Sequence, residues 1–182
     1  KFNPVSNSWT YLTPPLATAR TRFCATTING KIFIGPGVTG DYSYSNIATF
    51  FSVFRRDSWL YDPTNESWTK KDSFPNIRYG ASNFTIDSLV YVVGGSNNAH
   101  VPTSECWSYN PNGNGWTQRA NFTGPARMGG IGQTINNRGY YGFGVTQATG
   151  VYQTDWYEYV ASSNTWVLRA SPPVGYLGRF FG

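Results

Sequence analysis

The sequence has few of the residues from which most catalytic and metal sites are built. Its 182 residues include one histidine, two cysteines and nine carboxylate side chains, and charged residues make up only 13% of the chain. His100 alone does not build a multi-histidine copper site, and a Ser-His-Asp set has no second histidine to draw on. Cys24 and Cys106 are too few for a disulfide scaffold. We therefore expect no catalytic site, metal or cofactor in this chain.

Long apolar runs and clusters of basic residues are also missing. No run approaches the roughly 20 residues that span a bilayer, and no apolar leader follows Lys1. The formal net charge is +5, yet the longest basic runs are the pairs Arg55-Arg56 and Lys70-Lys71. Because a nucleic-acid footprint needs clustered charge, we expect neither a nucleic-acid partner nor a membrane span. The opening turn sequence leads us to expect a segment of a longer protein.

Aromatic residues and turn formers are abundant instead. Aromatics reach 18% of the chain, beside 20 glycines and 11 prolines. This mixture is too aromatic for a disordered chain and too rich in chain breakers for a helical bundle. Many short strands joined by turns have this composition, so we predict an all-β fold.

Four segments repeat one pattern, an aromatic residue seven positions before a tryptophan with turn formers between them. In three segments an Asn-Pro or Asp-Pro step starts the turn, since proline fixes φ and Asn or Gly accepts a positive φ. The tryptophans are separated by 59, 48 and 50 residues, close to the length of one propeller blade. The segments are Phe2–Trp9, Tyr61–Trp68, Tyr109–Trp116 and Tyr159–Trp166.

The remainder of each repeat supplies two more strands. An arginine opens a stretch of small residues, which suits a crowded inner strand. A polar dipeptide then marks a hairpin turn before the next strand. The arginines are Arg20, Arg78 and Arg127, and the strands after the turns begin at Lys31, Leu89 and Arg138. Each repeat is thus predicted to form one blade of four antiparallel strands.

This order of features resembles the kelch family: an aromatic residue, a proline turn, a tryptophan and a glycine doublet, here Gly94-Gly95. The stretch from Arg78 to Trp116 is most similar to a kelch repeat, whereas other glycine-containing triplets replace the doublet in the flanking repeats. The resemblance implies a β-propeller, or a partial propeller, of kelch-type blades. The stretch Trp59–Lys71 also resembles secreted bacterial kelch proteins of the Bacteroidetes, which implies secretion or a cell-surface location and leaves the cytoplasm open.

Counting strands predicts a single propeller segment, 1–182, with three complete blades at 11–71, 72–118 and 119–168. Remnants of other blades lie at 1–10 and 169–182. The resemblance implies six or seven blades in a ring, so one copy makes about half of it. Three ways of completing the ring stay open: further blades of a longer chain, a second copy, or a small four-bladed ring whose ends pair. An open half ring exposes sheet edges and an apolar face, so we expect self-association.

The loops between the second and third strands of the blades are the predicted binding surface, because loops on a rigid scaffold carry recognition. The first loop, from about Gly37 to Ser58, is long and rich in aromatics and arginine, as interaction hot spots are. The alternative is that these side chains fold back over the blade or form a hairpin from Ile47 to Phe54. The predicted binding residues in the three loops are Tyr42, Tyr44, Phe54, Arg55, Arg56, Asn97, Asn98, His100, Gln147 and Tyr152.

Propeller symmetry would place the repeated arginines, Arg20, Arg78 and Arg127, around the mouth of the central channel. The resemblance to kelch substrate adaptors implies that such arginines contact acidic ligands, and Ile77–Ala81 fits that context best. Guanidinium groups suit bidentate capture of a carboxylate. The alternative is that each arginine braces its neighbouring blade through backbone carbonyls.

Together these features predict a non-catalytic protein-interaction module that presents loops on one propeller face to a protein partner. The arginines favour an acidic partner. Two alternatives stay open. The exposed aromatics also fit carbohydrate binding or processing by a larger propeller, and unsealed propeller ends fit a self-assembling structural subunit.

Overall fold

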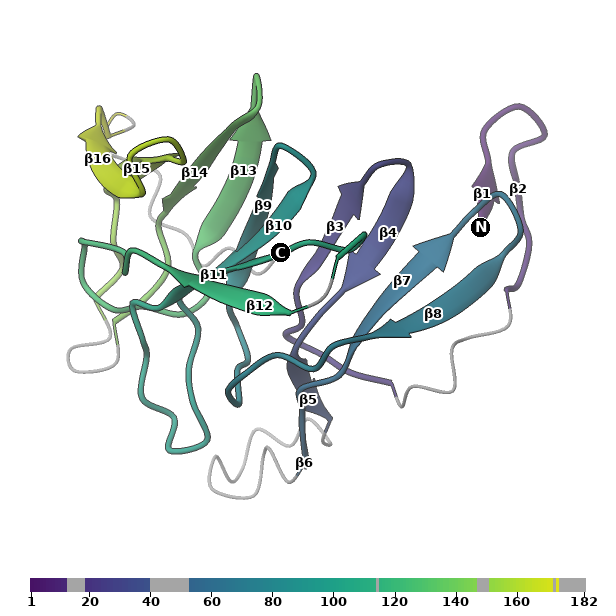
Figure 1. Ribbon diagram of the computed structural model, residues 1–182, viewed down its shortest axis with the longest axis horizontal. Coiled ribbons are helices and arrows are strands. Elements are labelled where there is room, and N and C mark those ends of the chain that lie inside the picture. The colour runs from purple at the N-terminus through teal and green to yellow at the C-terminus, as the bar shows by residue number, and fades with distance from the viewer. Residues whose placement is uncertain (13–18, 40–52, 114, 147–150, 172, 174–182) are drawn as a thin grey trace.

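The computed structural model describes residues 1–12, 19–39, 53–113, 115–146, 151–171 and 173, and its regular elements in these residues are all strands. Three four-stranded antiparallel sheets form three blades, and two two-stranded sheets accompany them (Figure 1). The predicted all-β fold of four-stranded blades is confirmed. In the described residues no helix is long and apolar enough to cross a membrane.

Within each blade the strands follow one another in chain order from the inside outwards. Blade I contains β3 (Ala25–Ile28), β4 (Lys31–Ile34), β7 (Ser58–Asp62) and β8 (Ser67–Lys71). Blade II contains β9 (Ser82–Ile86), β10 (Leu89–Val93), β11 (Cys106–Tyr109) and β12 (Trp116–Arg119). Blade III contains β13 (Ile131–Ile135), β14 (Arg138–Gly142), β15 (Trp156–Val160) and β16 (Thr165–Arg169). The outermost strands β12 and β16 thus end one residue beyond the predicted blade boundaries.

The turns between the first two strands of each blade are tight because their residues accept a left-handed backbone. Both central residues have positive φ in Asn29–Gly30 (49° and 73°), Asp87–Ser88 (48° and 62°) and Asn136–Asn137 (50° and 59°). Two consecutive positive φ values define the hairpin turn whose twist matches that of the strands. These are the three dipeptides from which hairpins were predicted.

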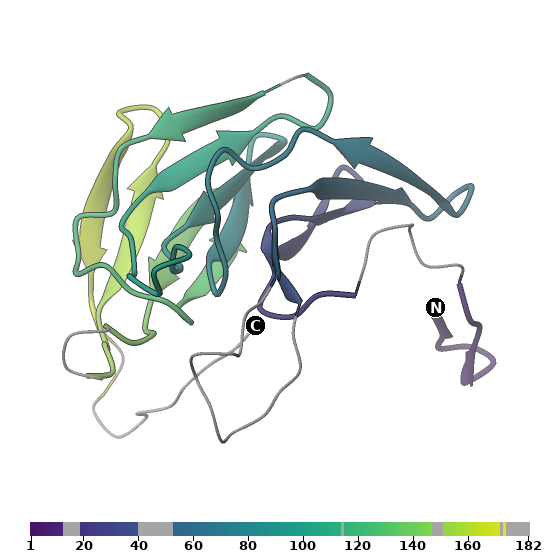
Figure 2. The ribbon, with the colours of Figure 1, turned by 90° about the horizontal axis from the view of Figure 1, so that it is seen from below.

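Neighbouring blades pack face to face, with β9 between β3 and β13 at the inner side of the arc (Figure 2). Phe33 of blade I joins Val90 and Val92 of blade II in one buried cluster, and a second cluster fills the space between blades II and III. Close approach of β14 to β9 requires glycine, because a Cβ on Gly139 would lie 2.2 Å from the Phe84 ring. Blade packing therefore accounts for the repeated apolar and small positions.

The repeated tyrosine and tryptophan build the outer half of each blade. Their ring centroids lie 4.8 Å apart in blades I and II and 5.0 Å apart in blade III. In blades II and III the indole N–H also ties the blade to the one before it. Trp116 donates to the Asp72 carbonyl (3.2 Å) and Trp166 to the Ala120 carbonyl (3.0 Å).

The two smaller sheets lie outside the blades. At the N-terminus, β1 (Phe2–Asn3) pairs with β2 (Ser8–Trp9). In the first long loop, β5 (Gly37–Thr39) pairs with β6 (Val53–Arg55). Most of the hairpin expected from Ile47 to Phe54 lies outside the described residues; its described end, Val53 and Phe54, belongs to β6 and pairs with β5.

Candidate functional site

The repeated arginines lie where each inner connection enters its blade, beside the loop between the second and third strands. Arg78 donates from Nη1 to the Gly94 carbonyl (3.0 Å) and from Nη2 to Glu105 Oε2 (2.6 Å). Arg20 likewise donates to a carbonyl at the end of β4 (3.0 Å) and to Asp57 Oδ2 (2.6 Å). Each arginine therefore joins the connection before its blade to both ends of the blade's loop.

Arg127 is the most enclosed of the three, with no exposed side-chain surface. It donates to both carboxylate oxygens of Asp155 and to the carbonyls of Phe143 (3.1 Å) and Pro125 (2.9 Å). Its guanidinium also lies over the Phe122 ring, 4.8 Å from the centroid. These bonds fall within one blade, so the expected bracing of a neighbouring blade is corrected to bracing of the arginine's own blade. The ligand role of the three arginines stays a prediction.

The acidic partners occupy one repeat position, which sequence reasoning missed. Asp57, Glu105 and Asp155 each stand four residues before the repeated tyrosine. The first two also accept an indole N–H, from Trp59 (2.5 Å) and Trp107 (2.9 Å). Aligning the repeats on the tyrosine would have revealed the acidic position.

The environment of Glu105 and Asp57 keeps both carboxylates ionised at neutral pH. Burial raises the pKa of Glu105, but hydrogen bonds from Trp107, Arg78 and Asn76 outweigh burial and lower the pKa overall. The pKa of Asp57 is lowered in the same way, with burial opposed by hydrogen bonds from Arg20 and Trp59. A charged, hydrogen-bonded pair at the base of the loop fixes the loop's position.

The loops fixed in this way form short hairpins. In blade I the hairpin is the β5–β6 pair. In blades II and III single bridges join Ser96 to Pro102 and Val145 to Tyr152. We call this side of the arc, with its three hairpins, the loop face.

One valine of each hairpin is exposed on the loop face. Val53, Val101 and Val151 each stand four residues before the acidic partner of the arginine. Their exposed fractions are 41%, 49% and 51%, and Tyr152 beside the last of them is 40% exposed. Sequence reasoning missed these valines as well, although the same alignment on the tyrosine brings them into one column.

The structure brings two predicted binding residues together at Tyr79 of blade II and places a third, Arg56, against the connection to that blade. The ring of Phe54 is half-buried, with its centroid 6.0 Å from that of Tyr79, so it packs on the next blade rather than back over its own. His100 Nδ1 lies 2.7 Å from the Tyr79 hydroxyl. Arg56 donates to the Phe74 carbonyl (2.8 Å) in the connection to blade II. These three side chains make contacts between the loops and their neighbours.

The other predicted residues play different parts. Asn97 accepts the backbone N–H groups of Ala99 (2.9 Å) and Val101 (3.1 Å) and so shapes its own turn. Asn98 is exposed at the tip of that turn, and Arg55 is half-buried in β6. Tyr42, Tyr44 and Gln147 lie outside the described residues.

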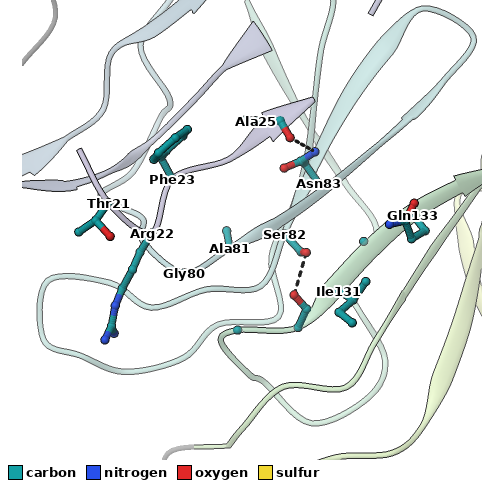
Figure 3. Close-up of a pocket in the computed structure, with 13 residues that line it drawn as sticks. Thr21, Arg22, Phe23, Ala25, Gly80, Ala81, Ser82, Asn83, Ile131 and Gln133 are labelled. Atoms are coloured by element: carbon teal, nitrogen blue, oxygen red, sulfur yellow. Dashed lines mark hydrogen bonds between the residues drawn. The ribbon is translucent and has the colours of Figure 1, made fainter. Parts of the chain in front are cut away.

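A cavity of about 590 Å³ follows the inner strands of the three blades (Figure 3). Its walls come from residues 21–23, 25, 80–83 and 129–133, which are mostly small or present their backbone. Arg22 at this cavity has φ 51°, and the aligned Gly80 and Gly129 have 61° and 63°. The lining includes no carboxylate or imidazole, so it offers no pair for general acid–base chemistry.

The cysteines and the few acidic residues do not form a further site. Cys24 and Cys106 are buried and unpaired, and burial raises the pKa of Cys24 to about 12 and that of Cys106 further. Within the described part of the chain, no three His, Cys, Asp or Glu side chains gather closely enough to hold a metal ion.

Comparison with known proteins supports the interpretation of the repeats as similar to kelch motifs. The kelch motif model matches residues 77–123, which include all four strands of blade II. Blade II therefore matches the kelch motif. Mouse Kelch-like protein 40 is 30% identical over 94 residues, which are 52% of this chain and 13% of that protein.

A solved structure shows the same fold over almost the whole chain. The structure of YjhT matches with a TM-score of 0.73 and 17% identity, covering 93% of this chain and 61% of that one. The chain therefore has a kelch-type β-propeller fold and spans less than two thirds of either protein.

Proposed function

We propose that this chain is a non-catalytic protein-interaction module that binds a protein partner on its loop face. The observation that carries the proposal is the exposed valine at one repeat position, Val53, Val101 and Val151. Apolar side chains spaced around one face of a rigid scaffold can be buried together by a single partner, and burial of apolar area drives association. Kelch repeats in general mediate protein–protein interaction.

The ion pairs beneath the loop face support this function by holding the hairpins in place before binding. A partner then loses less free energy in ordering the loops, because they are already ordered. Arg55 and Arg56 follow the first valine, Val53, by two and three positions, whereas Asp57 at the base of the β5–β6 hairpin is paired with an arginine. This charge distribution, with the net charge of +5, favours a partner that is apolar at the centre and acidic at the rim.

The test compares partners captured by the chain and by a loop-face variant that carries Val53→Arg, Val101→Arg and Val151→Arg. The control is Val5→Arg. Val5 is 95% exposed in the turn between β1 and β2, at the N-terminus, and lies off the loop face. After cross-linking and mass spectrometry, proteins bound by the chain and by the control should be lost from the loop-face variant. Retention of the same proteins by all three would contradict the proposal. A glycan-array signal that survives in the loop-face variant would favour carbohydrate binding instead.

A further inference from the structure

Arg22 stands at a backbone position where the aligned residues of blades II and III are glycine. Its φ is 51°, and Gly80 and Gly129 have φ values of 61° and 63°. One hydrogen bond repeats at this position, because Gly80 N donates to the Arg22 carbonyl and Gly129 N to the Gly80 carbonyl, both at 2.9 Å. The three residues are therefore structurally equivalent, and blade I alone of the three carries a side chain there.

A left-handed backbone is unfavourable for arginine. Glycine adopts it readily, and Asn and Asp adopt it more often than other residues. Non-glycine residues held in this region gather at ligand-binding sites. Phe143, which follows β14 as Gly94 follows β10, is a similar replacement, and its ring packs against that of Trp156 with centroids 5.3 Å apart. Arg22 instead lines the cavity of the inner strands and is half-buried.

Arg22 lies at the end of this cavity nearest the loop face. Thr21, the residue before it, exchanges two backbone hydrogen bonds with Val38 of β5 (2.8 and 3.1 Å). The β5–β6 hairpin also carries the exposed Val53. Figure 3 shows the Arg22 side chain extending away from Gln133, which lines the cavity further along the inner strands. An arginine of the cavity wall thus adjoins the first hairpin of the loop face.

The Arg22 side chain leaves the backbone on the side of blade II. A Cβ added to the equivalent Gly80 would lie 3.6 Å from Met128 Cβ, in the connection that enters the next blade. Because the repeats are equivalent at this position, the Cβ of Arg22 faces Tyr79, the residue of blade II that corresponds to Met128. The surroundings of the Arg22 side chain therefore come from blades I and II.

The charge of Arg22 acts on the loop-face residues of blade II. Burial raises the pKa of Tyr79, and a hydrogen bond with Ser96 and the positive charge of Arg22 oppose that rise. The Tyr79 hydroxyl lies 2.7 Å from His100 Nδ1, and the next residue, Val101, is 49% exposed. The guanidinium group and the hairpin that carries Val101 therefore meet at Tyr79.

The described wall of the cavity contains no carboxylate to match the charge of Arg22. The repeated arginines differ in this respect, since each pairs with an acidic residue of its own blade, as Arg78 pairs with Glu105. An acidic ligand would have to compete with those pairs. At Arg22 a carboxylate would meet a guanidinium group in a half-buried place, where opposite charges attract more strongly than in water.

We propose that Arg22 determines the specificity of the loop face by binding a carboxylate side chain of the protein partner. This role rests on the proposed function, since it places an Asp or Glu of the partner next to the apolar residues that cover Val53 and Val101. A guanidinium group suits a carboxylate because it donates two parallel hydrogen bonds. The left-handed backbone holds Arg22 in position before the partner arrives, which reduces the entropy lost on binding.

A random peptide library displayed on phage tests this role without a known partner. The chain should enrich peptides in which Asp or Glu adjoins an aliphatic residue. Arg22→Gly should lose the acidic preference and keep the aliphatic one, and Arg22→Glu should select Lys or Arg instead. The control Arg138→Gln removes the same charge from an exposed site on β14 and should select like the unaltered chain. An acidic preference that is absent from the chain, kept by Arg22→Gly or lost in the control would overturn the proposal.

The loop-face variant separates the role of Arg22 from the proposed function. The combination of Val53→Arg, Val101→Arg and Val151→Arg should lose the aliphatic preference. Survival of that preference would contradict the proposed function, whereas the acidic preferences of the chain and of Arg22→Gly decide the role of Arg22.

Affinity for the most enriched peptide, measured together with stability, distinguishes ligand binding from a structural role. Arg22→Gly should raise the Kd at least about tenfold and leave the melting temperature equal or higher, because glycine fits the left-handed backbone. Arg22→Lys keeps the charge without the planar fork and should raise the Kd about threefold. A lower melting temperature of Arg22→Gly with an unchanged Kd would assign a structural role and overturn the proposal.

Competition with N-acetylglutamate distinguishes a partner's side chain from a small acid. N-acetylglutamate lacks the apolar neighbours, so it should displace the peptide only at roughly 100-fold higher concentration than the unlabelled peptide does. Displacement at equal concentration would assign the site to a small acid and overturn the assignment to a protein partner.

Discussion

Replacing Arg78 by methionine tests whether the repeated arginines hold the blades together. Methionine fills much of the same volume and keeps a favourable contact with the Phe74 ring, which now lies 5.6 Å from the guanidinium carbon. The substitution removes the bonds to the Gly94 carbonyl and to Glu105. The Glu105 carboxylate then accepts hydrogen bonds only from neutral donors.

The expected loss of stability follows from these contacts. A hydrogen bond between charged groups contributes about 1.5–3 kcal/mol and one to a carbonyl about 1 kcal/mol. Breaking a buried ion pair costs about 3–5 kcal/mol, but the Glu105 side chain is 30% exposed and water will partly compensate. We therefore expect Arg78→Met to lower the free energy of unfolding by about 3 kcal/mol, which corresponds to roughly 6–12 °C in Tm for a domain of this size.

Urea denaturation and thermal melting measure this loss, with Arg138→Met as the matched control. The Arg138 side chain is 63% exposed and lies 3.3 Å from Glu158, so its removal should cost less than about 1 kcal/mol. If Arg78→Met changed stability as little as the control while abolishing partner binding, the bracing role would be refuted and Arg78 would be a ligand-binding residue.

Three further predictions concern stability and reactivity. Because the pKa of Glu105 is lower in the folded chain than its ordinary 4.5, its stabilising effect is present above that pH and is lost as the pH falls. Urea unfolding at pH 7 and pH 3 should show this loss, and equal midpoints would contradict it. Cys24 and Cys106 should resist a thiol reagent at pH 8 until the chain unfolds, since burial raises both pKa values; rapid labelling of the native chain would contradict this. Gly139→Ala should lower stability by about 1–3 kcal/mol or more, because the new Cβ would meet the Phe84 ring at 2.2 Å; an unchanged melting temperature would contradict that.

The blades could be predicted from the sequence because their signals are local and repeat. Dipeptides such as Asn29-Gly30 determine the hairpins through their backbone preference, and the spacing of Tyr109 and Trp116 marks the outer strands. Both signals act within a few residues, so tertiary context did not override them. The starts of β4, β10 and β14 therefore fall where they were predicted.

The site was less predictable because its contacts are made between distant segments. Arg127 and Asp155 are 28 residues apart, and nothing local to either indicates that they meet. The exposure of Val101 depends on how the hairpin from Ser96 to Pro102 is held, which only the folded blade determines. Aligning the repeats would have revealed the acidic position and the valine position. It would not have shown that the arginines are buried in ion pairs while the valines are exposed.

The central claim is that the exposed valines of the loop face bind the partner, whereas the buried arginines only hold the loops in position. The most direct test is the affinity of a captured partner for two variants, Val101→Arg and Arg127→Met, measured below the melting temperature of both. We expect Val101→Arg to weaken binding at least tenfold with unchanged stability, and Arg127→Met to lower stability while binding within about threefold of the unaltered chain. Full affinity in Val101→Arg together with lost affinity in a folded Arg127→Met would contradict the account.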